Sequence, residues 1–508
     1  MSVTSHREQS ARSAAFRIIH RIHSDDAFSN LLLPQELDRL HVPAQDRAFI
    51  TDAVYGSLRW QGFLDAVIAA VAHRPVEKVD AVSLDILRLG VYQALFMHSA
   101  DYAVVSTTVD LGKNGAPHSS PGFLNAVMRA VTSRTRQEWE AMLVSRIPKN
   151  NPDRRLALRY SHPQWIVEKF RESWNYAGYS LESGQSNSSS PLEELLAADN
   201  EPAEVVLCAR PGLITVKDLV AQVQQSSGGT ARWATGSYSP YALHVKGLDP
   251  GSLPAVRQNL AGAEDEGSQL AALALAKARK INPAGEQWLD MCAGPGGKAA
   301  LLAACAYQET SAESPLYPRA RAVTLIANEP AHHRANLVRK NLSAFIEPGR
   351  AQAIPQQTGI ISHVTEWDGR DIGEKYRQAC DRILVDAPCS GLGALRRRPE
   401  SRWRKQPEDI ANLTTLQMRL LDSAYLALKP GGILAYVTCS PVLAETSHQV
   451  DALLNRHPDL SRLDTRPIVA SISSKNDIPL PGRPGDIQLF EHLHGTDQMF
   501  ISLLVKKG

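Results

Sequence analysis

The stretch WLDMCAGPGGKAALLAACA at residues 288–306 decides the fold class of the C-terminal half of this chain. An apolar run leads into a glycine-rich loop, and the loop opens onto small residues at helical spacing. Glycines let a backbone approach a ligand closely, and the start of a helix offers free N–H groups. We therefore predict a strand, a ligand-binding loop and a helix. A glycine-rich turn of this kind is weak evidence alone, because a structural turn and the loop of a dinucleotide enzyme are alternatives. The loop lacks both the GxGxxG and the Walker spacing.

Three further segments repeat this pattern of a strand that ends in a loop. They are AVTLIAN at 322–328, DRILVDAP at 381–388 and GILAYVTCS at 432–440, and a helix candidate follows each of them. Strands that alternate with helices are typical of βαβ units and a parallel sheet. We predict a doubly wound, Rossmann-like α/β domain over residues 262–508.

The chain is multidomain, because its 508 residues exceed the usual size of one domain. Apolar residues at helical spacing, as in LDILRLGVYQALF at 84–96, predict an all-α bundle over residues 1–146. Residues 147–261 combine a helix candidate around 162–174, the Ser-rich linker GQSNSSSP at 184–191, and the strand candidates VVLCAR and YALHV. This mixture predicts a small α+β module.

Composition excludes several classes of protein. No apolar run approaches the roughly 20 residues that span a bilayer, so we expect no membrane segment. The polar, basic N-terminus lacks the apolar centre of a secretion signal, which predicts a cytoplasmic protein. Six cysteines without CxxC spacing predict reduced thiols and no metal site. Nothing in the sequence implies an oligomer, so we expect a monomer.

Acidic residues follow the predicted strands where doubly wound folds bind ligands. Glu329 stands after AVTLIAN, at the place where an acid accepts hydrogen bonds from ribose hydroxyls. Asp368 lies on the loop after the next predicted strand, where it could accept from an adenine amine or be a solvated turn residue. Lys298 could tether a carboxylate such as Asp386 or be a solvated residue at the helix start.

Two cysteines also stand at the ends of predicted strands. Cys389 belongs to DAPCS and Cys439 to TCS, so both thiols should lie at the carboxyl edge of the sheet and could face one substrate. Burial as small hydrophobic residues is the simpler interpretation of Cys208, Cys305 and Cys380.

CAGPGGK at 292–298, DAPCSGLG at 386–393 and VTCS at 437–440 resemble, in this order, the motifs of the RsmB (Sun/Fmu) family of bacterial 16S ribosomal RNA cytosine-5 methyltransferases. The helical region resembles that family's NusB-like RNA-binding domain in DRAFITDAVYGSLRW at 46–60 and PGFLNAVMRAV at 121–131. The resemblance covers nearly the whole chain. It implies a NusB-like domain at 1–146, a small RNA-binding module at 147–261, and an S-adenosylmethionine-dependent catalytic domain at 262–508.

The resemblance also implies roles for the site residues. Carbon 5 of cytosine is a poor nucleophile, so its methylation requires a thiolate that first adds to carbon 6. By resemblance, Cys439 is this nucleophile, Cys389 assists its release, and Asp386 serves as base or stabilises the adduct. The implied S-adenosylmethionine site comprises Cys292, Ala293, Gly294, Pro295, Gly296, Gly297, Lys298, Glu329, Asp368 and Asp386.

A basic stretch follows the Cys389 loop. It combines phosphate-neutralising charge with an aromatic ring, which is typical of RNA binding. We expect ribosomal RNA as the partner, contacted by Arg396, Arg397, Arg398, Arg402, Trp403, Arg404 and Lys405.

The sequence departs from the family pattern at three places. Glu329 stands where aspartate is commoner, CSPVLAET at 439–446 replaces an ending with paired Glu and Asn, and TDQMFISLLV at 496–505 lacks DGFF. Three alternative functions remain: a transfer RNA or 23S rRNA cytosine-5 methyltransferase, a NusB-like RNA-binding assembly or antitermination factor, and a nicotinamide-dependent reductase. The missing GxGxxG and the cysteine pair disfavour the reductase.

Overall fold

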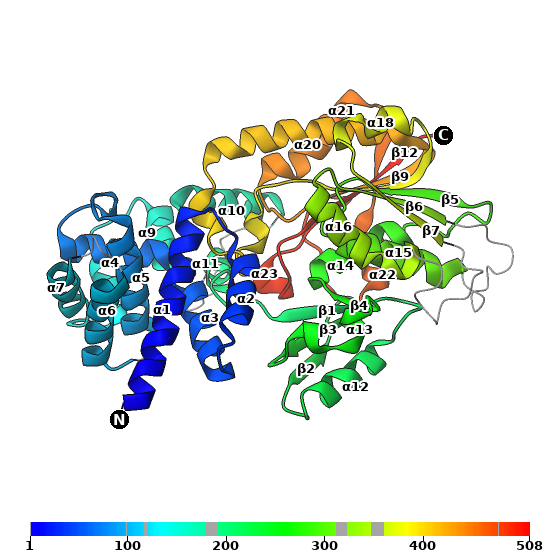
Figure 1. Ribbon diagram of the computed structural model, residues 1–508. Helices are drawn as coiled ribbons and strands as arrows, with labels where there is room; N and C mark the ends of the chain where they lie inside the picture. Colours follow the sequence, from blue (N-terminus) through cyan, green and yellow to red (C-terminus); the bar gives the residue numbers. More distant parts are fainter. Residues whose placement is uncertain are drawn as a thin grey trace. The chain divides into compact units, whose positions relative to one another are not determined.

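The computed structural model describes residues 2–97, 99–115, 120–178, 190–310, 323–346, 360–475 and 477–508 (Figure 1). These residues form two compact units. The helical unit comprises the described residues of 2–168, 190–202 and 395–405. The other unit, called the catalytic unit because it contains most of the predicted catalytic domain, comprises those of 169–178, 203–394 and 406–508. Residues 184–189 of the predicted linker lie outside the described residues. The domain boundaries at 146/147 and 261/262 stay predictions.

Helices alone build the helical unit, which confirms the predicted all-α bundle. Its principal helices are α1 (Ser2–Ser24), α2 (Ser29–Leu40), α3 (Ala44–Arg59), α4 (Gln61–Ala72), α5 (Ala81–Phe96), α6 (Asp101–Gly115), α7 (Pro121–Val131), α8 (Arg136–Ser145) and α9 (Pro152–Arg159). The short helices α11 (Pro191–Ala198) and α19 (Ser401–Arg404) join them, and α10 (Gln164–Tyr176) begins in this unit. A helix can begin where a side chain accepts from its free N–H groups, as Asp80 does for Ser83 at the start of α5.

Helix α5 forms the centre of the bundle. Its residues from Ser83 to Gln93 are all buried, because the sequence is apolar on every side of the helix. Gly90 lets α6 and α7 approach closely, since a Cβ there would lie 2.6 Å from the Thr108 hydroxyl. The buried Arg88 is satisfied by both carboxylate oxygens of Asp65, at 2.7 and 2.8 Å.

A small antiparallel sheet opens the catalytic unit. Its strands are β1 (Val205–Ala209), β2 (Arg232–Thr235), β3 (Ala242–Lys246) and β4 (Ala261–Ala263), in the order β2-β3-β1-β4. Helices α12 (Val216–Ser226) and α13 (Pro254–Arg257) share its apolar core. The predicted strands VVLCAR and YALHV correspond to β1 and β3.

The large sheet carries the catalytic unit's main core. Its strands run in the order β10-β12-β9-β8-β5-β6-β7, and β11 pairs with β12. The strands are β5 (Glu286–Asp290), β6 (Val323–Asn328), β7 (Ile360–Thr365), β8 (Cys380–Asp386), β9 (Leu428–Thr438), β10 (Leu460–Leu463), β11 (Asp486–Gln488) and β12 (Phe500–Lys506). The five strands from β9 to β7 are parallel, as predicted. The edge formed by β10, β11 and β12 is antiparallel, so the sheet is mixed.

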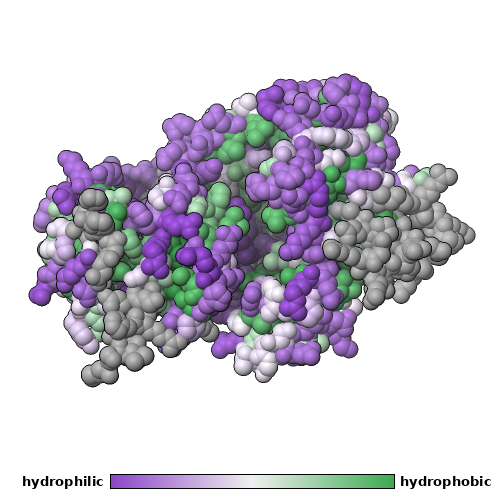
Figure 2. Space-filling view, viewed as in Figure 1, coloured by the Kyte–Doolittle hydropathy of each residue, from purple (hydrophilic) through white to green (hydrophobic). Residues whose placement is uncertain are grey.

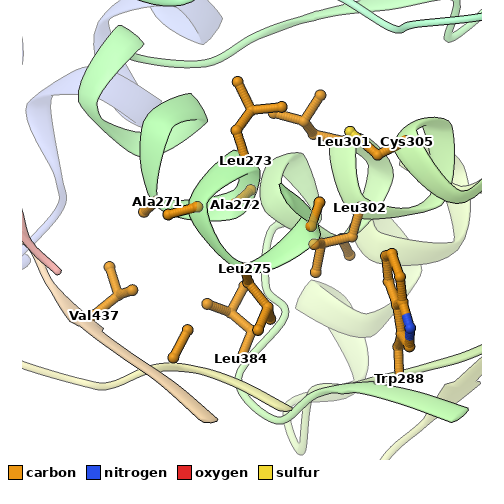
Figure 3. Packing of buried hydrophobic residues seen from close by; sticks show 14 of the residues in the cluster. Ala271, Ala272, Leu273, Leu275, Trp288, Leu301, Leu302, Cys305, Leu384 and Val437 are labelled. Atoms are coloured by element: carbon orange, nitrogen blue, oxygen red, sulfur yellow. The ribbon is translucent and has the colours of Figure 1, made fainter. Parts of the chain in front are cut away.

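Helices cover both faces of this sheet (Figure 1). α14 (Glu266–Lys277), α15 (Gly297–Thr310) and α22 (Thr465–Ile472) share one core with Trp288 and Leu384. α18 (Ile372–Lys375), α20 (Pro407–Ala427) and α21 (Ser447–Arg456) lie on the other face, and α20 and α21 share the second core with Leu289 and Ile383. Neighbouring residues of a strand point to opposite faces, which explains the alternation. Figure 3 shows leucines of α14 and α15 above Leu384 and Trp288. The remaining helices are α16 (His332–Asn341), α17 (Ser343–Ile346) and α23 (Glu491–His494).

A buried ion pair joins β5 to β8. The Arg382 Nε lies 2.7 Å from the Glu286 Oε2, and both side chains are fully buried. Arg382 also donates to the carbonyl oxygens of Leu275, Ala276 and Arg279 at the end of α14. β6 lies on one side of this strand pair and β9 on the other. The strand order therefore reverses between β5 and β8, where doubly wound folds open a ligand crevice at the carboxyl ends.

Candidate functional site

The carboxyl ends of β5 and β8 carry the candidate site. β5 ends at Asp290 and leads into the predicted ligand loop, and α15 begins at Gly297. β8 ends at Asp386, three residues before Cys389. β9 ends at Thr438, directly before Cys439. The residues predicted from the motifs thus lie at one edge of the sheet.

Glycines let the predicted ligand loop pack closely against α16 and against Glu329. A Cβ at Gly294 would overlap the carboxylate of Glu329, so only glycine fits there without a shift. Gly296 has a φ of +112°, and a Cβ on it would lie 3.0 Å from the Cα of Val338 in α16. Asn341 of the same helix donates to the Pro295 carbonyl at 2.9 Å. This loop is therefore held close to α16.

Glu329 stands beside the loop, as the sequence predicts. Its side chain is almost fully buried, and its Oε1 accepts from the backbone N–H of Ala331 at 3.0 Å. The Arg334 guanidinium lies 3.3 Å from its other oxygen and also donates to the Gly294 carbonyl at 2.7 Å. Glu329 is thus a fixed acceptor at the end of β6, and its contact with a ribose stays a prediction.

Asp368 lies after β7 and caps a short turn. Its carboxylate accepts from the Arg370 backbone N–H at 2.9 Å and also binds the Arg370 side chain. The hydrogen bond from the Arg370 side chain lowers the pKa of Asp368 to about 2, although burial opposes this shift. The structure therefore gives Asp368 the geometry of a turn residue, and its contact with an adenine stays a prediction.

Three carboxylates surround Lys298 at the start of α15. The Lys298 Nζ lies 2.8 Å from the Asp386 Oδ2, which favours the tethering role over a solvated one. Although burial opposes it, the charges of Asp386 and Glu264 raise the pKa of Lys298. Burial raises the pKa of Asp290 to about 8, with a further contribution from Asp386, and burial also raises the pKa of Glu264. One lysine thus faces more acidic groups than it can neutralise.

The two cysteine sulfurs face each other. The Cys389 Sγ and the Cys439 Sγ are 3.5 Å apart, although 50 residues separate them in the chain. The hydrogen bond between them and burial raise the pKa of Cys389 well above its ordinary value. The negative charge of a Cys439 thiolate also contributes to the raised pKa of Lys298. The expectation that both thiols could face one substrate fits this geometry.

Gly393 holds the two cysteine loops close together. Its N–H donates to the Cys439 carbonyl at 2.9 Å, and its carbonyl accepts from the Gln498 N–H at 2.8 Å. A Cβ at Gly393 would overlap the Gln498 carbonyl and lie 2.9 Å from the Cys439 carbonyl carbon. The last glycine of DAPCSGLG is thus required by this approach, and Gln498 of the divergent TDQMFISLLV segment supplies a backbone contact.

Three members of the basic stretch, Arg402, Trp403 and Arg404, contact the interior of the helical unit, and their predicted contact with RNA stays a prediction. Arg402 is fully buried within the helical unit, and Trp403 donates to the Leu58 carbonyl at 2.8 Å. Arg404 donates to the carbonyls of Asp26 and Ala27 at 3.0 and 2.8 Å. These three side chains stabilise the helical unit, because its backbone carbonyls accept hydrogen bonds from them. The acceptors of Arg402 are the carbonyls of Ser161 and Asp199 and the side chain of Asn200.

The other members of the stretch remain candidates for RNA contact. Arg398 is exposed and lies over the Phe28 ring at 5.6 Å, while Arg396, Arg397 and Lys405 are half-buried. Their contact with RNA stays a prediction.

Sequence reasoning missed four acidic or polar groups of the site. Asp290 ends a predicted strand, so its position was a usable signal. Glu264, Glu445 and Gln417 lie outside the three motifs, and only the folded chain brings them near Lys298 or the cysteine loops.

In the part of the chain that the structure describes, no helix is long and apolar enough to cross a membrane. Figure 2 shows a mostly hydrophilic visible face, with apolar residues in small areas. Within the same described ranges, no three His, Cys, Asp or Glu side chains gather in a way that could hold a metal ion.

Comparison with known proteins adds sequence and fold similarity. A sequence model described as 16S rRNA methyltransferase RsmB/F matches residues 280–505, and one of the NusB family matches residues 9–133. A Mycobacterium tuberculosis protein named as a methyltransferase is 40% identical over 97% of this chain and 96% of its own length. Ribosomal RNA small subunit methyltransferase B of Pseudomonas syringae is 28% identical over 97% and 96%. The crystal structure of PH0851 has the same fold, with 20% identity, a TM-score of 0.72, and coverage of 97% of this chain and 99% of that one.

Proposed function

We propose that this chain, which belongs to the RsmB/F family of methyltransferases, transfers a methyl group from S-adenosylmethionine to carbon 5 of a cytosine in 16S ribosomal RNA. The pair of cysteine sulfurs 3.5 Å apart carries this proposal. A methyl acceptor that is already nucleophilic, such as a ring nitrogen or a hydroxyl, requires no thiol. Carbon 5 of cytosine requires one, and a second group must assist its release.

The acidic residues around Lys298, namely Asp290, Glu264 and Asp386, fit S-adenosylmethionine. This cofactor carries a sulfonium and an ammonium group, and it supplies the methyl group when bound. Asp386 and Glu264 outnumber Lys298, and Asp290, whose pKa burial raises to about 8, can release its proton when a cation binds. The site therefore favours a cationic ligand over an anionic one. Glu329 offers an acceptor for ribose hydroxyls beside Gly294.

In the proposed mechanism, Cys439 is the nucleophile. Its sulfur bonds to carbon 6 of the cytosine, and the electron pair of the 5,6 double bond makes carbon 5 nucleophilic. The positive charge of Lys298, at the start of α15, supports the thiolate. Asp386, held by Lys298 at 2.8 Å, stabilises the proton on ring nitrogen 3 of the adduct.

Cys389 assists the release of the product. Its raised pKa keeps it as a thiol at neutral pH. After the methyl group arrives, the proton on carbon 5 leaves to a base, the double bond re-forms and the bond between Cys439 and carbon 6 breaks. The Cys389 thiol donates a hydrogen bond to the departing sulfur, which makes Cys439 a better leaving group.

The NusB match over residues 9–133 supports an RNA substrate, and a ribosomal substrate implies a cytoplasmic enzyme. We propose that Arg396, Arg397, Arg398 and Lys405 help to hold the RNA. Charge reversal at Arg397 and Arg398 together should weaken RNA binding and flatten its dependence on salt. An unchanged salt slope would remove these residues from the RNA-binding surface.

Transfer of a tritiated methyl group to separated RNA pools tests the substrate. The pools come from cells that lack the enzyme, and wild type is compared with Cys439→Ala. We expect label in 16S rRNA, located at 5-methylcytosine and absent with the variant. Label confined to transfer RNA or 23S rRNA would show that this RNA, and not 16S rRNA, is the substrate. Absence of label from every pool and from isolated ribosomal particles would favour an RNA-binding assembly factor.

A further inference from the structure

Glu445 connects the loops that carry the two cysteines. It lies at the end of a short turn, Leu443–Glu445, and its side chain is fully buried. Its Oε1 accepts from the Ser390 N–H at 2.7 Å, and its Oε2 accepts from the Ser390 hydroxyl at 2.6 Å and the Ser440 hydroxyl at 2.7 Å. Ser390 directly follows Cys389, and Ser440 directly follows Cys439. One carboxylate therefore holds the residue after each cysteine.

The surroundings fix Glu445 itself. The Tyr436 hydroxyl donates to the Glu445 carbonyl at 2.7 Å. The Gln417 amide donates to the Pro388 carbonyl at 2.9 Å and lies 3.4 Å from the Glu445 Oε1. Ser440 also accepts from the Val442 N–H at 3.1 Å, so its hydroxyl has a defined direction. The carboxylate thus lies in a closed network that includes both sides of the Cys389 loop.

No salt bridge accounts for this buried acid, since among the described residues its hydrogen bonds come from amide and hydroxyl groups. Burying a carboxylate without a cation is costly, and neutral residues could pack the same space. β8 and β9 are already joined by their parallel ladder as far as the pair Asp386 and Val437. The hydrogen bonds of Glu445 act beyond that ladder, on the loops that hold the sulfurs.

We propose that Glu445 is a positioning residue that fixes the two cysteine loops in one arrangement, so that Cys439 can attack carbon 6 while Cys389 remains beside it. This role rests on the proposed function. Because Ser390 and Ser440 bind the same carboxylate, the two cysteine loops cannot move apart without breaking a hydrogen bond to Glu445. Loss of the carboxylate should leave the cofactor crevice intact and misplace the sulfurs.

A mechanism-based trap measures the position of the nucleophile. A 16S rRNA transcript that contains 5-fluorocytidine cannot lose the substituent at carbon 5, so the enzyme stays covalently bound after methyl transfer. Glu445→Ala should form this adduct about 100-fold more slowly than wild type, since an error of about 1 Å in a reacting atom costs that much. Binding of S-adenosylmethionine, measured by calorimetry, should change by less than about threefold, because the hydrogen bonds of Glu445 among the described residues go to Ser390, Ser440, Gln417 and Tyr436 and not to the predicted cofactor residues.

Three variants separate positioning from folding. Glu445→Gln keeps the shape and can still bind both serines, so it should recover most of the adduct rate. Ser440→Ala removes one connection and should slow the adduct about 10-fold, in line with the loss of one hydrogen bond to a charged group. Glu286→Gln weakens a buried acid elsewhere in the same unit and should lower stability without lowering the adduct rate of the folded protein.

The outcomes are distinct. If wild type forms no adduct with this RNA, the proposed function fails. If wild type forms it and both Glu445→Ala and Ser440→Ala match its rate, the positioning role of Glu445 is wrong. If Glu445→Ala does not fold, Ser440→Ala and Ser390→Ala test the proposal in its place. A wild-type adduct rate in both of these variants would show that the positioning role of Glu445 is wrong.

Discussion

Replacing Arg382 by methionine should destabilise the catalytic unit by about 3–5 kcal/mol, because it removes one partner of a buried ion pair. Glu286 would keep the Trp288 indole N–H at 2.6 Å, the Asn282 N–H at 2.9 Å and the Arg279 guanidinium at 3.8 Å. Part of this loss comes from the carbonyls at the end of α14, which would lose their donor. The ion pair joins β5 to β8, so the loss of stability should be measurable in these two strands.

The loss should depend on pH in a defined direction. Although burial opposes it, the hydrogen bond and charge of Arg382 hold the pKa of Glu286 below its ordinary value of 4.5. This carboxylate therefore stabilises the folded state above pH 4.5, and the contribution disappears as the pH falls through the lower folded pKa. In Arg382→Met the acid would take up a proton instead. The difference in stability between wild type and variant should accordingly shrink below pH 4.5.

Urea unfolding followed by hydrogen exchange of peptides from β5 and β8 measures this loss for the catalytic unit alone. The double variant Glu286→Leu and Arg382→Met should recover at least about 2 kcal/mol, because it removes the unpaired charge and leaves only the carbonyls without donors. Arg377→Met is the control, since its ion pair with Glu374 is exposed and should contribute less than about 0.5 kcal/mol. A loss below about 1 kcal/mol in Arg382→Met would refute the reasoning.

Three further changes test the site and the helical unit. Gly393→Ala should slow methyl transfer at least about 10-fold, because the added Cβ separates the cysteine loops. Gly391→Ala is the control, because Gly391 has open space around it and the change should cost only backbone strain of about 1 kcal/mol. Equal activity of both variants would contradict the argument. Asp290→Asn should raise the melting temperature of the cofactor-free protein, because the pKa of about 8 makes the ionised acid unfavourable in the folded state. The gain in melting temperature should grow from about pH 4 to about pH 8. A gain that is constant with pH would show another cause. Arg402→Met should destabilise the helical unit by about 3 kcal/mol and Arg398→Met by less than about 0.5 kcal/mol, measured by urea unfolding, and equal losses would place Arg402 at the surface.

The sequence pattern was sufficient to predict the sheet edge and the residues on it. Strand-to-loop transitions place Cys389 and Cys439 at carboxyl ends, because parallel strands all end at the same edge. The distance between the sulfurs depends on β8 and β9 being neighbours, and strand order requires pairings that periodicity does not encode. The antiparallel β12 was missed for a related reason: FISLLV is an apolar run that fits a parallel or an antiparallel central strand equally well.

Side-chain partners were the least predictable part. The charge of Arg402 is visible in the sequence, but its acceptors are two carbonyls and an amide from distant segments. Glu445 carries no motif that links it to Ser390, and the network exists only after the chain brings the two loops together. Glu264 precedes α14 without any local signal, and burial, with a contribution from the charge of Asp386, raises the pKa of its carboxyl.

The covalent adduct tests the central claim most directly. Cys389→Ala should accumulate an RNA adduct that survives denaturation, because Cys439 can still add to carbon 6 but is released slowly. Addition of Cys439→Ala to this variant should abolish the adduct, while both proteins still bind S-adenosylmethionine. An adduct that persists without Cys439 would contradict the proposed mechanism. The mechanism would also be contradicted if neither wild type nor Cys389→Ala formed an adduct with unmethylated 16S rRNA or with ribosomal particles.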